Sequence, residues 1–416
     1  MFIDREFARF LSWCAVVVTL GIVSAIAFVV VIDPYRIYRF VDHLSLNQIT
    51  PSLDRFQEEI KITGARQSKA NVFIMGNSRA EIGFDPEFLN QLNSQYSAYN
   101  LAIAGSRIAT ARRELNYFRA HDHKPKVIVL GLEFLDFLVD PSRPQIKRVE
   151  ENTIPSADAF KWKFESLFSL TSVADAIKTI HIQKVSEAET ITSRGFNPLL
   201  EYKKYAREQG YYALFQQRAI ENAKSYVRKP HSLVDADSKS SQDWNDLDAI
   251  LDSAAKDQTE LHLTIYPYHA QILFMFEEAG MWPAFEQWKA MIAEKIAHVK
   301  AIYPNAQISL WDFSGYSSVQ CEPIPAKGNI LQPTQWYWEA GHFKKELGNM
   351  MLAHIVGQAT SALPGHEIGR KLTVASVQQN QRRIESERSA CLSSHPALLN
   401  DAKALIHDAR SAMSGR

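Results

Sequence analysis

The sequence predicts an α/β fold: a three-layer, doubly wound parallel sheet with a helical insertion and one N-terminal transmembrane helix. From about residue 71 onward, short β-branched-rich runs of strand length alternate with stretches of helical spacing. Near-continuously apolar strands that alternate with helices are typical of a parallel sheet covered on both faces. One long uncharged run, residues 11–32, precedes this pattern and predicts the membrane helix.

Composition excludes several classes of protein. The chain has 416 residues, 46% of them apolar, which rules out whole-chain disorder and allows a large core. Its 46 Lys and Arg balance 46 Asp and Glu, so no overall basic field attracts nucleic acid, and we expect no nucleic-acid partner. Three scattered cysteines without a CxxC pair cannot build a disulfide-dense scaffold or a thiolate-rich zinc site.

Residues 11–32 are predicted to be a transmembrane anchor after a short tail, residues 1–10. The 22 uncharged residues would span about 33 Å as a helix, enough to cross the hydrocarbon core of a bilayer. A cleavable signal peptide is the alternative, because Ala25-Ile26-Ala27 imitates a cleavage site. Cleavage there would leave the apolar run FVVVI on the new N-terminus, so we favour an uncleaved anchor that binds the lipid bilayer.

The orientation of this anchor is set weakly by charge. Two arginines lie on each side of it, Arg5 and Arg9 before, Arg36 and Arg39 after, so the positive-inside comparison is nearly even. Because a very short N-terminal tail most often stays in the cytosol, we expect a single-pass protein of the inner (cytoplasmic) membrane with a periplasmic C-terminal domain. In that compartment Cys321 and Cys391 could form a disulfide, with two free thiols as an equal alternative.

The rest of the chain divides by its apolar pattern. Residues 33–70 are polar and predict a stalk or an edge helix. An α/β domain is expected over residues 71–357, with strands at 71–75, 98–104, 126–132, 261–266 and 307–311.

Two regions depart from the strand and helix alternation. Residues from about 140 to 245 predict a helical insertion that caps the functional edge of the sheet, or packs elsewhere on the domain. Residues 358–416 are highly charged and predict a surface helix or a tail.

A serine follows the first predicted strand directly, in the run Gly76-Asn77-Ser78-Arg79. In a doubly wound sheet this turn opens at the carboxyl edge, beside the point where ligands bind. Gly76 allows a sharp turn, and the Ser78 hydroxyl would lie near helix-terminal N–H groups that can stabilise an oxyanion. A helix N-cap is the structural alternative for Ser78.

A carboxylate and a histidine follow the last predicted strand. Glu339 precedes His342 by three residues, a spacing at which the carboxylate can accept a hydrogen bond from the imidazole Nδ1–H while Nε2 points to a nucleophile. The last strand ends at the same sheet edge as the first, which favours a Ser78, His342 and Glu339 triad over two solvated residues.

These blocks resemble the SGNH, or GDSL-like, hydrolase superfamily over residues 70–357. GNSR at 76–79 is similar to the family's nucleophile block, Gly105 falls where its oxyanion glycine belongs, and Glu339 to His342 is similar to its DxxH block with Glu for Asp. The resemblance implies a flavodoxin-like sheet, a nucleophilic Ser78, and an oxyanion hole built from the N–H groups of Ser78 and Gly105.

One block departs from the family. The oxyanion-donating asparagine of its GxND block is replaced by Glu133. A carboxylate there repels a developing oxyanion, and losing one donor costs roughly a hundred- to a thousandfold in rate. Either Asn77, Arg79 or Arg107 substitutes as the donor, or the protein is not an efficient hydrolase. Glu133 could instead hold Arg79 in place.

Among SGNH-like proteins, the membrane anchor and the GNSR, GLEF and WEAGH blocks are similar to the teichoic-acid D-alanine-transfer protein and to exopolysaccharide O-acetyltransferases. This implies an O-acyltransferase or esterase acting on a cell-envelope polysaccharide or glycopolymer, with a membrane protein as acyl donor. The alternative is a catalytically degenerate domain that binds polymer or scaffolds a synthesis complex.

Other chemistry has less support. His269 follows the fourth predicted strand and is expected at the same edge, as a substrate contact or alternative base, unless it hydrogen-bonds within a turn. No nucleotide-binding glycine motif follows a strand and no metal-ligand spacing is evident. We therefore expect neither a cofactor nor a metal ion.

Overall fold

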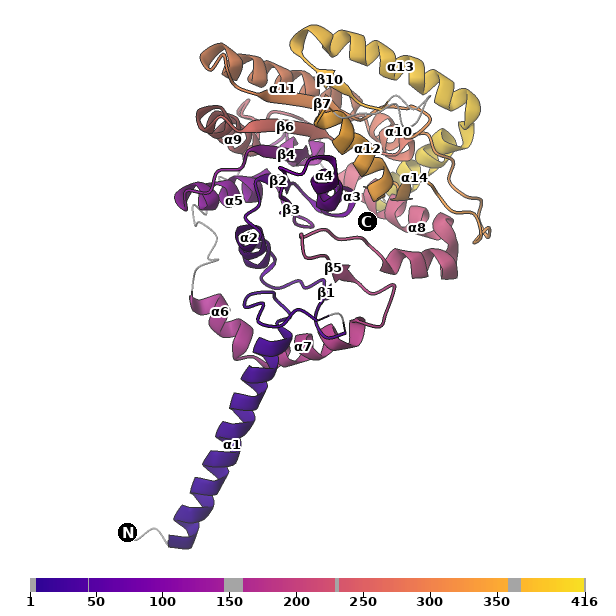
Figure 1. Ribbon diagram of the computed structural model, residues 1–416. Coiled ribbons are helices and arrows are strands. Elements are labelled where there is room, and N and C mark those ends of the chain that lie inside the picture. Colours follow the sequence, from indigo (N-terminus) through magenta and orange to yellow (C-terminus); the bar gives the residue numbers. More distant parts are fainter. Residues whose placement is uncertain (1–4, 44, 146–159, 229–231, 358–367, 415–416) are drawn as a thin grey trace.

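The computed structural model describes five stretches of the chain, residues 5–43, 45–145, 160–228, 232–357 and 368–414 (Figure 1). Parts of the predicted N-terminal tail (1–4), insertion (146–159 and 229–231) and C-terminal segment (358–367) lie outside the described residues. Helix α1 (Arg5–Ile32) projects from the globular part, and only 11% of its most apolar window is buried. By length and composition it can cross a membrane.

A six-stranded sheet forms the centre of the globular part. Its order is β10-β7-β6-β4-β2-β3, with bounds β2 (Val72–Met75), β3 (Ala98–Asn100), β4 (Val127–Leu132), β6 (Glu260–Ile265), β7 (Ile308–Asp312) and β10 (Arg370–Leu372). The first five are parallel and β10 is an antiparallel edge. The predicted mixed α/β fold with a mostly parallel sheet is therefore confirmed.

The strand order places a switch point at β2. Strand β3 pairs with one side of β2 and β4 with the other, so successive crossovers leave in opposite directions and open a crevice at the carboxyl ends of the strands. Every residue of β2 and β4 is buried, because helices cover both faces of a parallel sheet.

Two groups of helices cover the sheet (Figure 1). One contains α5 (Ile108–Ala120), α9 (Asp243–Asp257) and α11 (Trp282–Ile302), which contact one another in sequence. The other contains α3 (Ser78–Gly83), α4 (Pro86–Leu92) and α12 (Lys345–Ile355), whereas α10 (Ala270–Glu278) contacts α11 and α8. The core between them is apolar and continuous.

The predicted stalk is part of the globular unit. Helix α2 (Gln57–Gln67) packs against β3 and buries Lys61, Ile62 and Ala65, and β1 (Thr50–Pro51) pairs with β5 (Thr190–Ile191) of the insertion. Of the two alternatives for residues 33–70, the structure thus has an edge helix.

The insertion separates into two parts. Helices α6 (Phe160–Leu167) and α7 (Leu170–Ile182) contact α1, whereas α8 (Glu201–Arg228) contacts α10 and the strand β8 (Tyr337–Glu339). Helix α8 breaks at Gly210, whose φ of +79° favours glycine. Among the described helices of the insertion, α8 is the one that lies where a cap was predicted, against the strand that carries Glu339.

The C-terminal segment is not a tail. Residues 370–372 complete the sheet as β10, and α13 (Val377–Ser394) and α14 (Pro396–Ser414) pack onto the domain. The physical reason is an apolar stripe in each helix beneath its charged face, formed by Ile384 and Cys391 in α13 and by Leu398, Ala402, Ile406 and Ala409 in α14.

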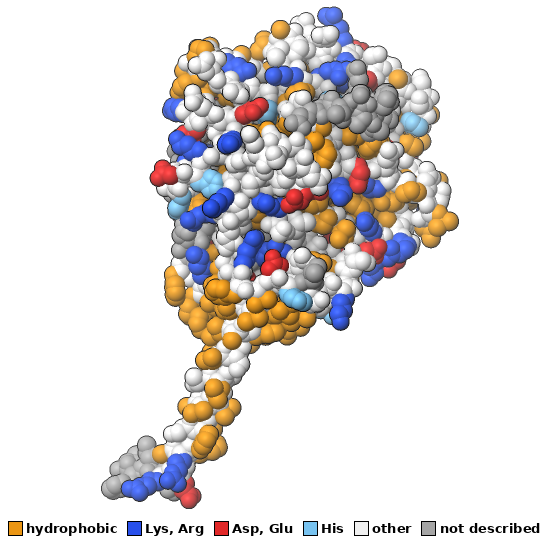
Figure 2. Space-filling view, viewed as in Figure 1, with side chains coloured by type: hydrophobic (Ala, Val, Ile, Leu, Met, Phe, Trp, Pro, Cys, Tyr) orange, Lys and Arg blue, Asp and Glu red, His pale blue; other side chains and the backbone are white. Residues whose placement is uncertain are grey.

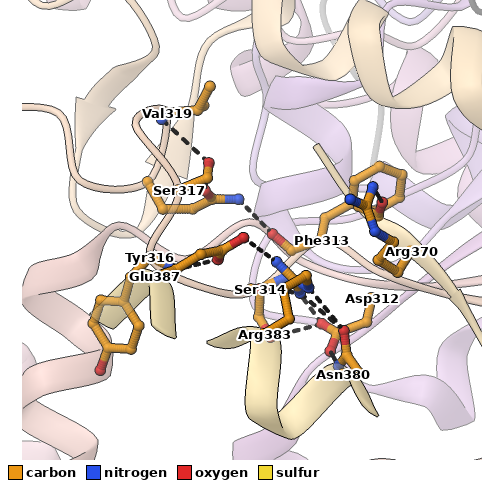
Figure 3. Close-up of polar contacts among 12 residues, drawn as sticks. Asp312, Phe313, Ser314, Tyr316, Ser317, Val319, Arg370, Asn380, Arg383 and Glu387 are labelled. Atoms are coloured by element: carbon orange, nitrogen blue, oxygen red, sulfur yellow. Dashed lines mark hydrogen bonds and ion pairs between the residues drawn. The ribbon is translucent and has the colours of Figure 1, made fainter. Parts of the chain in front are cut away.

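Polar contacts hold α13 against the end of β7 (Figure 3). Asn380 Nδ2 donates to the buried Asp312 carboxylate at 2.7 Å, and Arg383 donates to the Ser314 carbonyl oxygen at 3.3 Å. On the other side, Lys289 lies 3.1 Å from Asp312. Although burial raises the pKa of Asp312, Lys289 and Ser314 together hold it below its ordinary value.

A disulfide joins Cys321 to Cys391, 70 residues apart, and ties α13 to the loop after β7. We expect Cys391→Ser to lower the free energy of unfolding by roughly 2–5 kcal/mol, because the bridge restricts the unfolded chain. Chemical unfolding of both proteins without reductant measures this loss. Cys14→Ser, which removes the unpaired cysteine of α1, should leave stability unchanged. Equal stability of Cys391→Ser and the natural chain would contradict the prediction.

Candidate active site

Ser78 lies at the carboxyl end of β2, on the first turn of α3. Gly76 makes the sharp turn between them with a φ of +138°, and a Cβ there would lie 2.6 Å from Tyr266 Oη. Asn77 caps α3, since its side chain accepts from the Arg79 N–H at 3.1 Å. The N-cap is thus Asn77, which leaves the Ser78 hydroxyl available for another partner.

Glu339 and His342 face each other across a tight hairpin. Strand β8 ends at Glu339, β9 (His342–Phe343) begins at His342, and the two residues are paired across the two-residue turn Ala340-Gly341. Helix α12 follows at Lys345. Glu339 and His342 therefore lie opposite each other in the hairpin, and β9 contacts α3, the helix that carries Ser78.

The three predicted residues form one chain of hydrogen bonds. Ser78 Oγ lies 2.8 Å from His342 Nε2, and His342 Nδ1 contacts Glu339 Oε1. Because an ionised carboxylate only accepts, His342 Nδ1 carries the proton and Nε2 is free to accept from the Ser78 hydroxyl. The histidine side chain is 14% exposed, so the site is reachable from outside.

Glu339 is held ionised within the protein. It is 1% exposed, and burial raises its pKa, but His342, Arg218 and the Gly341 N–H together hold that pKa below its ordinary value. The Gly341 N–H donates to Oε2 at 2.6 Å, and Arg218 Nε lies 3.6 Å from Oε1. A carboxylate with fixed partners orients the imidazole and stabilises its protonated form.

Arg218 was not predicted from the sequence. It comes from α8 in the insertion, more than a hundred residues before Glu339, and belongs to no local motif. Only the contact of α8 with β8 brings it to the site.

Glu133 forms an ion pair with Arg79, as one of the two sequence hypotheses expected. Its carboxylate also accepts from Tyr268 Oη at 3.1 Å, from Asn77 Nδ2 at 3.3 Å and from the Leu135 N–H at 3.4 Å. Burial lowers the pKa of Arg79, but Glu133 outweighs that effect and raises it. The positive guanidinium therefore offsets the negative charge that stands in place of an oxyanion donor.

The loop with Gly105 follows β3 and is tied to the nucleophile turn. The Ile103 N–H and the Ser106 hydroxyl both donate to the Gly76 carbonyl oxygen, at 3.1 and 3.0 Å. Gly105 is exposed and has a φ of +72°. Arg107 instead forms an ion pair with Asp243 of α9 at 2.7 Å. This ion pair disfavours Arg107 as the substitute oxyanion donor.

Of the alternatives for His269, the structure has the histidine that is hydrogen-bonded within a turn. It is fully buried at the start of α10, where Nδ1 accepts from the Gln271 N–H at 3.2 Å and Nε2 donates to the Glu322 carbonyl oxygen at 2.7 Å. The backbone N–H of His269 donates to the carbonyl oxygen of Ala340 in the hairpin turn. Both ring nitrogens are occupied, so His269 supports the hairpin and cannot serve as a base.

The buried His269 should make stability depend on pH. Burial lowers its pKa from 6.5 to about 4, so the folded state resists protonation, and stability present above pH 6.5 is lost as pH falls toward 4, by about 3 kcal/mol at most. His269→Asn keeps an acceptor for the Gln271 N–H but does not titrate. Urea unfolding at pH 7 and pH 4.5 should show a stability gap between the two proteins that narrows at the lower pH. An unchanged gap would contradict this role.

A pocket of about 360 Å³ is lined by residues of α3, α8, β8 and the start of α12, and its lining does not include the three triad residues. Its lining combines apolar and aromatic side chains with lysines, among them Ile82, Trp338, Tyr211, Lys203 and Lys344. Lys344 Nζ lies over the Trp338 ring at 4.9 Å. Burial lowers the pKa of Lys344 to about 8, so its charge changes near neutral pH.

Neither the protein-family models nor the curated proteins compared with the chain match it. Over the described ranges, no group of three His, Cys, Asp or Glu side chains is placed to hold a metal ion. The side chains of the site are therefore the basis for its chemistry.

Proposed function

We propose that this chain is a membrane-anchored serine acyl-ester enzyme of the SGNH type, an O-acyltransferase or esterase for a cell-envelope polysaccharide or glycopolymer. The observation that carries the proposal is the continuous chain from Ser78 through His342 to Glu339. A serine hydroxyl bonded to a histidine that a buried carboxylate orients is the arrangement that nucleophilic acyl transfer requires.

The site residues fit a two-step reaction. Ser78 Oγ bonds to the acyl carbon while its proton passes to His342 Nε2, and His342 returns that proton to the donor oxygen as the bond from that oxygen to the acyl carbon breaks. An acceptor hydroxyl then gives its proton to His342 and attacks the acyl-serine, and Ser78 recovers the proton. Water as acceptor makes the protein an esterase, and a sugar hydroxyl makes it a transferase.

The SGNH assignment is supported by the positions of the blocks on the sheet. The nucleophile follows β2, the first parallel strand, Gly105 follows β3, and the acid and base follow the last parallel strand. In the proposed mechanism the N–H groups of Ser78 and Gly105 stabilise the oxyanion, and Arg79 offsets the charge of Glu133. With one donor fewer than the family pattern, we expect a slow enzyme.

The envelope location is supported by two features. Helix α1 is apolar enough to anchor the domain in a membrane, and the Cys321 to Cys391 disulfide suits an oxidising compartment. The lysines and aromatic rings of the pocket lined by α3, α8 and β8 suit a polar polymer with sugar faces. A membrane protein in the same bilayer would supply the activated acyl group.

Labelling with a serine-directed fluorophosphonate tests the proposal. We expect the detergent-solubilised full-length chain to be labelled, Ser78→Ala to remain unlabelled, and Ser389→Ala, which changes an exposed serine of α13, to be labelled normally. Folding of each variant is checked by its thermal unfolding midpoint. A folded natural chain that is never labelled, or a Ser78→Ala variant labelled as well as the natural chain, would overturn catalysis by Ser78 and favour the scaffold alternative.

A further inference from the structure

An apolar surface surrounds the end of α1 on the globular part (Figure 2). Helices α6 and α7 supply much of it with large side chains that face outward. The exposed ones are Phe160 (78%), Phe164 (44%), Phe168 (51%), Leu170 (90%) and Ile177 (57%). Phe164 and Phe168 stack on each other at 4.2 Å, so they form a continuous apolar face, which soluble surfaces rarely carry.

Helix α7 has a fixed position next to the last turns of α1. Val29 and Ile32 of α1 form a buried cluster with Ala176 of α7. Just beyond α1, Tyr35 Oη donates to Asp175 at 2.6 Å, and Asp33 accepts the backbone N–H groups of residues 37–39, which fixes the turn. The C-terminal end of α1 and helix α7 therefore lie at the same height along the axis of α1.

The outward face of α7 carries the apolar Leu170, Ala174 and Ile177 at helical spacing. The exposed Thr171, Lys178 and His181 border this apolar stripe with polar groups. An apolar stripe bordered by polar side chains suits the boundary between water and an apolar medium. Because α1 is itself long and apolar enough to cross a membrane, the medium available to that outer face is the boundary of the same bilayer.

Charge around the face favours lipid headgroups. Between residues 160 and 185 there are four lysines and two acidic residues, and one of these acids, Asp175, is paired with Arg55 and Tyr35. The exposed Lys161, Lys178 and Lys184 flank the apolar side chains. Lysines beside an apolar helix face can reach headgroups while the ring and aliphatic groups enter the acyl boundary.

We propose that the outer face of α6 and α7 lies in the interfacial layer of the bilayer that α1 crosses, as a second membrane attachment. Two attachments at one level, held together by the α1 to α7 contact, fix the tilt of the whole α/β domain. The crevice that contains Ser78 then keeps a constant height and direction relative to the lipid. The second attachment concerns only how the α/β domain is held at the membrane, and it does not depend on the proposed chemistry.

Depth-dependent quenching in vesicles tests the attachment. The full-length chain, with Cys14→Ser and its disulfide left intact, is labelled with an NBD dye at Ile177→Cys and reconstituted in phosphatidylcholine and phosphatidylglycerol vesicles that contain headgroup-proximal nitroxide lipids. The matched control is Ile302→Cys at the end of α11, which is 57% exposed, like Ile177. We expect a blue shift and strong quenching at position 177 and neither at position 302.

Two results would overturn the proposal. One is a probe at position 177 that lipid nitroxides quench no more than the probe at position 302. The other is a blue shift at position 177 that disappears when protein is diluted in lipid, which would assign the face to a second copy of the chain. Leu170→Cys, at a side chain 90% exposed and so free of packing, gives the same reading if Ile177→Cys does not fold.

Discussion

Ser78→Ala and His342→Ala are each expected to lower the acyl-transfer rate by roughly 10⁶-fold, the loss that follows removal of the serine or the histidine from a working triad. The serine carries the acyl group and the histidine moves its proton, so neither step proceeds without both. The 2.8 Å contact between Ser78 Oγ and His342 Nε2 is the structural basis. The double variant should be no slower than either single variant, because the two residues act as one unit.

Hydrolysis of an activated acetyl ester, such as p-nitrophenyl acetate, measures this loss in the absence of a known acceptor. His354→Ala is the matched control, because His354 is a half-buried histidine of α12 whose ring contacts a backbone carbonyl oxygen rather than the triad. Its rate should be that of the natural chain. A natural chain that turns over the ester while Ser78→Ala keeps its rate would remove Ser78 from the mechanism.

The sequence predicts the central strands of the sheet better than it predicts the ends and edges of the sheet. The run VIVLGL was predicted as a strand because a strand buried on both faces is apolar throughout, and β4 is buried throughout. The second predicted strand, 98–104, ends early at Asn100, whose side chain donates to the carbonyl oxygens of Ala80 and Phe84 and turns the chain. No local pattern announces that tertiary contact.

Edges and insertions were harder to predict. Strand β10 has two exposed residues out of three, so it lacks the apolar signal of a strand and pairs only because β7 offers an open edge. The apolar stripe of α14 was present in the sequence, but the charged residues of α13 before it favoured a surface segment. In both cases the missing information was the identity of the partner surface.

In the candidate site, too, residues of local motifs were predicted from the sequence and residues brought in by tertiary contacts were not. Ser78, Glu339 and His342 belong to short motifs at strand ends, so the sequence could bring them to one edge. Arg218 contacts that site from a distant helix, and no motif marks it. The two alternatives for His269 stayed open because a histidine after a parallel strand suits both a site and a buried cap, and only its two hydrogen bonds decide between them.

Glu339→Gln is expected to lower the rate by roughly 10⁴-fold while leaving the fold intact. The amide is close in size to the carboxylate and its oxygen can still accept from the Gly341 N–H. Its NH₂ group, however, can donate to His342 Nδ1, which moves the imidazole proton to Nε2, the atom that must accept from Ser78. In a triad, replacing the carboxylate by an amide favours this unproductive tautomer and costs about that factor.

Glu221→Gln is the matched control, because Glu221 is the other carboxylate that pairs with Arg218, at 2.9 Å, and its side chain is 50% exposed. Ester hydrolysis and the rate of fluorophosphonate labelling should both fall in Glu339→Gln and stay unchanged in Glu221→Gln, with equal unfolding midpoints. If Glu339→Gln kept the natural rate, the carboxylate would not orient the imidazole, and the short contact between Glu339 and His342 would have to be structural.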